Sequence, residues 1–181
     1  MTTARTTAAR TGATRTTAHV SATDTPIGPF TAVVAADGAV LASGWTTDVA
    51  ELLSKVAPRL RPANLVERPD LGAVTRAVRA YHDGDLAVID DVPVRQEGGA
   101  FTAGAWRALR TVPAGEPISY AGFALLAGRP SAVRAAAGAC AKNPATLFVP
   151  CHRVVAANGP GGFRWGAEVK GWLLAHEARA A

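Results

Sequence analysis

The pair Cys151-His152 has the clearest potential for chemistry in this sequence. A cysteine attacks as its thiolate, and a neighbouring base or cation favours the thiolate by lowering the thiol pKa. His152 is such a base. Adjacent side chains of an extended segment point to opposite faces, so proton transfer between Cys151 and His152 could require a bridging water molecule. The competing interpretation is a buried, inert cysteine beside a surface histidine.

The residues before this pair favour the reactive interpretation. The apolar run 147–149 predicts a short extended segment that ends at Pro150 and delivers Cys151 to the edge of a helical region. The second cysteine, Cys140, lies among alanines and is expected to be a small buried residue.

Composition limits the class of protein. The chain has 181 residues, 49% of them hydrophobic, which fits one domain or two small ones with a packed core. Two cysteines are too few for a disulfide-stapled secreted domain, and their spacing does not resemble a zinc site, so we predict no metal and no cofactor. No apolar stretch is long enough to cross a membrane and no signal peptide is recognisable, so we expect a cytoplasmic location without membrane contact.

Charge is distributed unevenly along the chain. Residues 1–16 carry three arginines and no acidic residue, and they predict a disordered basic tail. Residues 17–100 carry seven basic and eleven acidic residues, whereas residues 101–181 carry nine basic and three acidic ones. This asymmetry indicates that the second half meets a polyanion such as nucleic acid.

The first half predicts a small α/β unit with antiparallel strands, over residues 17–92. Strands are expected at 19–23, 30–35 and 39–45, the last two joined at Asp37-Gly38, which is typical of a hairpin turn. Helices are expected over 49–56 and from an Asp70 cap to about Tyr81.

The second half, residues 93–181, predicts a mostly helical domain. Helices are expected over 101–111, from a Ser119 cap to about 127, from a Ser131 cap to about 142, and over 167–179. The second and third of these, joined by 128–130, suggest a helix-turn-helix, although an ordinary helical hairpin would have the same spacing. The third helix has small side chains and projects only Arg134 and Lys142 far, so it suits close approach to a nucleic-acid backbone more than base reading.

Several spaced motifs, in order, resemble the O6-alkylguanine-DNA alkyltransferase family, also called methylated-DNA–protein-cysteine methyltransferases. The resemblance covers residues 101–177 and is weaker over 18–45. Its motifs are Phe101…Trp106, Gly115-Glu116…Ser119-Tyr120, Gly128-Arg129-Pro130, Val133-Arg134-Ala135, Asn143-Pro144, Pro150-Cys151-His152-Arg153-Val154 and Val169-Lys170…Trp172-Leu173-Leu174-Ala175-His176-Glu177.

The resemblance implies a single-use repair protein that acts on duplex DNA. Cys151 would accept the alkyl group of O6-alkylguanine, with O4-alkylthymine as a further candidate substrate, after the base is flipped out of the helix. His152 and Glu177 would form a Cys–water–His–Glu network, and Asn143 would hold the turn near the cysteine. Tyr120 would help to rotate the nucleotide and would protonate the leaving base.

The same resemblance implies the DNA contacts and the pocket. Arg134 would enter the base stack from the minor groove and fill the space of the extruded guanine. The protein would act as a monomer and could cluster along DNA. The further DNA contacts expected are Ser119, Tyr120, Ala135, Gly138 and Lys142, and the expected pocket residues are Pro150, Val154, Phe163 and Arg164.

Some features leave alternatives open. Arg164-Trp165 is bulkier than is usual in the family's base-covering loop, which predicts slower transfer of benzyl than of methyl groups. Glu177 could instead be a solvated helix-end residue, and the neighbouring His176 is expected on the helix surface. The rival functions are a lesion-binding protein without transfer, a helix-turn-helix transcription factor and a Cys-His hydrolase.

Overall fold

A four-stranded sheet forms the first half of the molecule in the computed structural model, which describes residues 16–180. The strand order is β3-β2-β1-β4, with antiparallel pairs except for the parallel pair of β1 and β4. The strands are β1 (Thr17–Thr25), β2 (Gly28–Ala35), β3 (Val40–Gly44) and β4 (Asn64–Glu67). The proposed tail, residues 1–16, lies outside the described residues except for Thr16.

The three antiparallel strands confirm the prediction from the alternating pattern. Gly38 has a φ of +88°, which glycine adopts without strain, and its N–H donates to Ala35 O at 2.9 Å to close the β2–β3 turn. Strand β4 was not predicted, because its four residues are all exposed and therefore show no apolar alternation.

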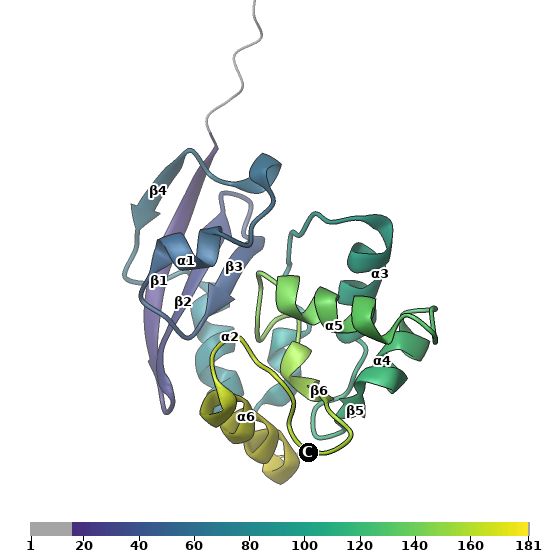
Figure 1. The fold of residues 1–181 in the computed structure, drawn as a ribbon. Coiled ribbons are helices and arrows are strands. Elements are labelled where there is room, and N and C mark those ends of the chain that lie inside the picture. Colours follow the sequence, from purple (N-terminus) through teal and green to yellow (C-terminus); the bar gives the residue numbers. More distant parts are fainter. Residues whose placement is uncertain (1–15, 181) are drawn as a thin grey trace, which may run out of the picture.

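Two helices cover the sheet. Helix α1 (Val49–Leu53) is shorter than predicted and is capped by Asp48, and helix α2 (Ala73–His82) lies on the other side of the sheet (Figure 1). Asp70 does not cap α2 as expected: it accepts from the N–H of Gly72, and the helix begins three residues later at Ala73. Two 3-10 helices, Pro58–Leu60 and Leu86–Ile89, complete this half.

The second half is helical, as predicted (Figure 1). Its helices are α3 (Ala100–Leu109), α4 (Tyr120–Leu126), α5 (Val133–Lys142) and α6 (Ala167–Ala180), and a short parallel pair joins β5 (Ile118–Ser119) to β6 (Val154–Val155). Ser119 caps α4 by accepting from Gly122 N–H at 3.0 Å, as expected. The predicted Ser131 cap is wrong, because α5 begins at Val133 after Ala132, without a side-chain cap.

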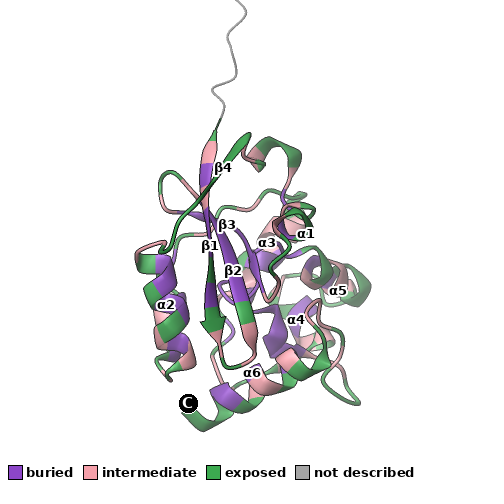
Figure 2. Cartoon of the chain, turned by 90° about the vertical axis from the view of Figure 1, so that its left-hand side faces the viewer, coloured by how far each residue is buried: buried purple, intermediate pink, exposed green. Residues whose placement is uncertain are grey.

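One apolar core joins the two halves. Phe30 and Val34 of β2 and Tyr81 of α2 pack in the same buried cluster as Trp106 of α3 and Leu173 of α6. Figure 2 shows these buried strands in the middle of the molecule, with exposed residues along the outer helices. A second, smaller cluster lies between the sheet and α1. Within residues 16–180, no helix combines the length and apolar character needed to cross a membrane.

Candidate functional site: a buried cysteine below an open cavity

Cys151 begins a short 3-10 helix (Cys151–Arg153) and is only 6% exposed. The run before it is not extended, contrary to the prediction: it folds into a turn in which Val149 N–H donates to Ala145 O at 2.9 Å. Leu147 within this turn has a φ of +78°, a left-handed conformation that is unusual for a non-glycine residue. The apolar run 147–149 predicted an extended segment because its side chains are suited to burial. They are indeed buried, but in a turn.

Strand β3 holds this turn from the first half of the chain. Ser43 Oγ donates to Thr146 O at 2.8 Å, and Thr146 Oγ1 donates back to Ser43 O at 2.7 Å. Both residues are buried, so the two hydrogen bonds are shielded from water. The position of the cysteine is therefore set by both halves of the molecule.

Asn143, at the end of α5, lies beside the thiol as predicted. Its Nδ2 donates to Cys151 Sγ at 3.2 Å and to Val149 O at 2.7 Å, and its Oδ1 accepts from Ala145 N–H at 3.1 Å. Burial raises the pKa of Cys151, while the hydrogen bond from Asn143 and the charge of Lys170 act in the opposite direction. The same amide thus braces the turn and donates to the sulfur, a contact that partly offsets the effect of burial on the thiol pKa.

His152 and Glu177 form the pair that the resemblance implied. His152 Nε2 lies 2.8 Å from Glu177 Oε1, and both residues are almost fully buried at 0% and 1% exposed. Glu177 is therefore not the solvated helix-end residue of the alternative. Because Oε1 accepts, the imidazole carries a proton on Nε2, and its Nδ1 has no partner among residues 16–180.

Two further side chains complete this network and were missed from the sequence. Buried Arg153 donates to both carboxylate oxygens of Glu177, from Nε to Oε2 at 3.0 Å and from Nη2 to Oε1 at 2.9 Å. Tyr81 Oη donates to Oε1 at 2.7 Å. Arg153 balances the buried carboxylate charge, as a buried ion requires.

The electrostatics favour a neutral imidazole beside an ionised carboxylate. Burial lowers the pKa of His152, and its contact with Glu177 only partly offsets this effect. Burial alone would raise the pKa of Glu177, but the hydrogen bonds and charges of His152 and Arg153 hold it far below its usual value. At neutral pH the histidine can therefore accept a proton.

Lys170 on α6 is a second buried cation that the sequence did not reveal. Its Nζ donates to Val154 O at 2.7 Å and to Gly162 O at 3.2 Å. These bonds join β6 to the glycine-rich loop 159–166. His176, expected on the helix surface, is also buried, and its Nε2 donates to Tyr81 O at 2.7 Å.

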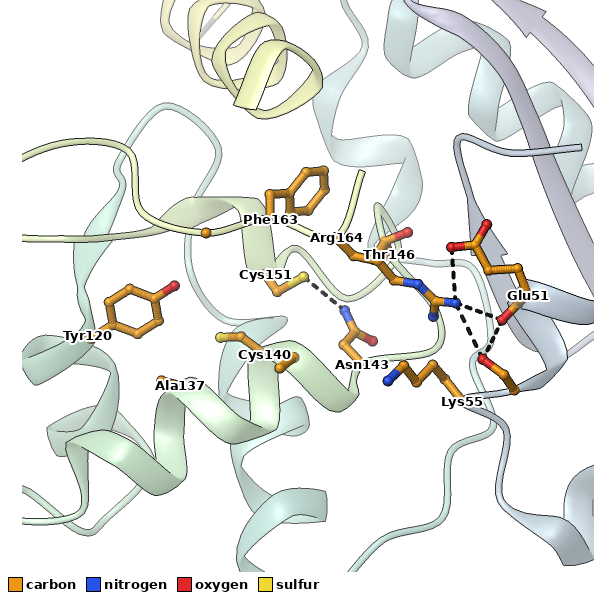
Figure 3. Close-up of a pocket in the computed structure, with 13 residues that line it drawn as sticks. Glu51, Lys55, Tyr120, Ala137, Cys140, Asn143, Thr146, Cys151, Phe163 and Arg164 are labelled. Carbon is orange, nitrogen blue, oxygen red and sulfur yellow. Dashed lines mark hydrogen bonds and ion pairs between the residues drawn. The ribbon is translucent and has the colours of Figure 1, made fainter. Parts of the chain in front are cut away.

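A cavity of about 600 Å³ opens above the thiol (Figure 3). Tyr120 lies on one side of it and Phe163 on another, and Cys140 and Asn143 line it next to Cys151. Burial raises the pKa of Tyr120, so its hydroxyl keeps its proton at neutral pH. Glu51 of helix α1 also lines the cavity, together with Ser54 and Lys55, which follow directly after this helix.

Arg164 and Trp165 point toward the first half of the chain. Arg164 Nη2 donates to Glu51 O at 2.6 Å, and its guanidinium lies over the Trp165 ring. Trp165 donates to Thr146 Oγ1 at 2.8 Å and packs so closely on Gly44 that a Cβ there would collide with its ring. Their side chains therefore fix the loop against the first half of the chain, while Arg164 also lines the cavity. Slower transfer of benzyl than of methyl groups stays a prediction.

The remaining predicted residues are the DNA contacts on α5 and the pocket residues. Arg134, Ala135 and Lys142 are exposed on α5, with Gly138 half-buried on the same helix. Pro150 and Val154, predicted as pocket residues, do not line the cavity found within residues 16–180. Both are buried, and Val154 packs in the main core and pairs with Ile118. Phe163 and Arg164 do line the cavity.

Comparison with known proteins agrees with this site. Residues 100–179 match the family described as 6-O-methylguanine DNA methyltransferase, DNA binding domain. The methylated-DNA–protein-cysteine methyltransferase of Salmonella typhimurium is 35% identical over 156 residues, which cover 84% of this chain and 91% of that protein. A protein of the same name from Shigella flexneri is 40% identical over 107 residues, covering 59% of this chain and 63% of that one.

A solved structure extends the similarity to nearly the whole fold. The Mycobacterium tuberculosis OGT in complex with DNA has a TM-score of 0.74 and 30% identity, covering 90% of this chain and 94% of that chain. This match includes the sheet of the first half, which the family match at 100–179 leaves out. The chain belongs to the methylated-DNA–protein-cysteine methyltransferase family.

Proposed function

We propose that this protein repairs DNA by direct reversal, transferring the alkyl group of O6-alkylguanine irreversibly to its own Cys151. The observation that carries the proposal is a cavity of about 600 Å³ that ends on a buried thiol, beside a neutral histidine paired with an ionised carboxylate. The names of the relatives that match this chain point to the same activity.

The proposed transfer is a displacement at the alkyl carbon. The Cys151 proton passes through water to His152 Nδ1, and Glu177 stabilises the imidazolium that forms. The thiolate then forms a bond to the alkyl carbon while the carbon–O6 bond breaks, and the electron pair leaves with guanine. Tyr120 donates its hydroxyl proton to the leaving base and regains a proton through water from the His152 imidazolium, so the thiol proton is in net terms transferred to guanine. The thioether product has no bond that water readily cleaves, so each molecule acts once.

We propose that α4 and α5 act as a helix-turn-helix that binds the minor groove of duplex DNA. Exposed Arg134 would enter the stack and replace the flipped nucleotide, which offsets part of the cost of extrusion. The exposed residues Ser119, Ala135 and Lys142, together with half-buried Gly138, would contact the backbone at close range.

The organisation of the whole chain is a proposal of the same kind. Residues 17–92 would form a supporting α/β unit and residues 93–181 the DNA-binding and alkyl-acceptor unit, with residues 1–16 adding non-specific basic charge. We propose a monomer that acts in the cytoplasm and clusters along DNA. Selection between O6-alkylguanine and O4-alkylthymine would depend on the cavity walls.

The test is peptide mass spectrometry after incubation with a duplex that contains one O6-methylguanine. Trypsin cleavage after Arg134, Lys142 and Arg153 places the two cysteines in separate peptides, 135–142 and 143–153. We expect one methyl group on the peptide of Cys151 and none on the peptide of Cys140, which serves as an internal control.

Two outcomes would overturn the proposal. Binding of the duplex with no modification of Cys151 would identify a lesion-binding protein, and sequence-specific binding without preference for the lesion would identify a regulator. The Cys151→Ala variant is expected to retain lesion binding and lose transfer completely.

A further inference from the structure

Tyr81 brings the first half of the chain into contact with the carboxylate beside the reactive centre. It lies on α2, is fully buried, and its hydroxyl donates to Glu177 Oε1 at 2.7 Å. The same residue accepts from α6 at its backbone, because His176 Nε2 lies 2.7 Å from Tyr81 O. Hydrogen bonds with two adjacent residues of α6, one donated and one accepted by Tyr81, therefore fix Tyr81 in place.

We infer that Tyr81 is a positioning residue for the alkyl transfer, through which the first half of the chain holds Glu177 against His152. The inference rests on the proposed function. It adds to the His152–Glu177 network a residue that precedes the region 100–179 matched by the family.

The geometry at one oxygen carries the argument. Glu177 Oε1 accepts from His152 Nε2 at 2.8 Å, from Tyr81 Oη at 2.7 Å and from Arg153 Nη2 at 2.9 Å. Arg153 Nε also lies 3.2 Å from this oxygen, so donors from three residues saturate it and prevent the carboxylate from rotating. The imidazole must then keep its proton on Nε2, which leaves Nδ1 free to accept the thiol proton.

Tyr81 also reduces the basicity of the carboxylate without adding charge. Burial and the Glu177 charge raise the pKa of Tyr81, so its hydroxyl stays protonated and remains a donor at every working pH. A carboxylate with one donor fewer would attract the imidazole proton more strongly and favour imidazolium. Loss of the hydroxyl should therefore leave His152 protonated at a higher pH.

Other charged groups face this network, but none offers an equally clean test. Arg153 is buried against the carboxylate of Glu177. The charge of Lys170, on α6, interacts with His152, and the charge of Asp90 interacts with Arg153 and Glu177. His176 and His82 lie against the Tyr81 ring. Replacing any of these changes a charge or an ionisable group, whereas Tyr81→Phe removes one neutral hydroxyl.

The experiment compares Tyr81→Phe with Val78→Ala. Val78 lies one turn earlier on α2 and is equally buried, but its side chain has no polar contact with Glu177. For each protein the single-turnover rate of methyl transfer from a duplex is measured from about pH 5 to pH 8.5. Alkylation of Cys151 by iodoacetamide, read on the tryptic peptide 143–153, is measured over the same range without DNA.

We expect Tyr81→Phe to move the acidic midpoint of both profiles upward by about one pH unit, so that the rate below the midpoint falls about tenfold. Val78→Ala should lower stability and leave the midpoint in place. An unchanged midpoint in Tyr81→Phe would overturn the inference, and so would an equal shift in Val78→Ala. If the unsubstituted protein failed to transfer methyl, the proposed function would fall, while the iodoacetamide profile would still decide the role of Tyr81.

Discussion

Tyr120 has the position and protonation state that an acid for the leaving base requires. Its ring forms part of the cavity wall that faces Cys151, and burial raises the pKa of its hydroxyl. Its ring also packs against Gly161, where a Cβ would lie only 3.2 Å from the Tyr120 ring. The side chain is therefore held in the cavity by the loop that closes over it.

We expect Tyr120→Phe to slow methyl transfer about a hundredfold, the range typical of a single proton donor. The ring remains, so affinity for the lesion duplex should change little. The measurement is a single-turnover rate at saturating protein, paired with a binding isotherm. A full-speed variant with weakened binding would show that the hydroxyl assists extrusion of the nucleotide only.

Only some residues of the site could be identified from the sequence. Cys151 is suggested by the residue types alone, whereas Glu177 and Asn143 could be placed beside it only through the family resemblance. The burial of Arg153 and Lys170 could not be predicted, because cations are usually exposed and their carboxylate or carbonyl partners are distant in sequence. Arg153 and Lys170 do lie within the motifs that resemble the alkyltransferase family, and this is the signal by which they could have been identified as site residues.

At the scale of elements, the features that were predicted correctly are those that depend on residues close together in the sequence. The Asp37-Gly38 turn and the Ser119 cap are confirmed, since each depends on neighbours in sequence. The turn at Leu147 was missed because an apolar run has the same composition whether it is a strand or a buried turn. Hydrogen bonds from Ser43, over a hundred residues away in sequence, help to determine its path.

Two helical glycines allow stability to be separated from DNA contact. A Cβ at Gly104 of α3 would meet only the end of Arg107 at 3.8 Å, and a Cβ at Gly138 of α5 would meet nothing within 4 Å. Replacement of either by alanine should stabilise the fold by about 1 kcal/mol, because alanine loses less backbone entropy in a helix.

The two variants should differ on DNA. Gly138 lies on the helix that we propose to pack closely on the duplex, so Gly138→Ala should weaken binding, whereas Gly104→Ala serves as the matched control with unchanged affinity. Urea unfolding and a binding isotherm at fixed salt give the two readouts. Equal DNA affinities in both variants would argue against close approach of α5.

At the scale of the molecule, the first half acts as a scaffold for the second. Strand β3 holds the turn before Cys151 through Ser43, and helix α1 anchors the cavity loop through Arg164. Helix α2 supplies Tyr81 to the carboxylate. These contacts come from three different elements, so damage to the first half of the chain should affect the chemistry at Cys151.

The same buried network predicts how stability depends on pH. Burial lowers the pKa of His152 and His82 below the usual 6.5, so the unfolded chain takes up protons first and stability falls as pH drops through that value. The depressed pKa of Glu177 adds a loss of stability that begins below about pH 4.5, whereas the raised pKa of exposed Asp90 acts in the opposite direction. We therefore expect the free energy of unfolding, measured in urea, to decrease from about pH 7.5 to about pH 5. His82→Gln should flatten this slope, because it removes one of the two groups whose pKa burial lowers. A free energy of unfolding that rises toward acid pH would contradict the assignment.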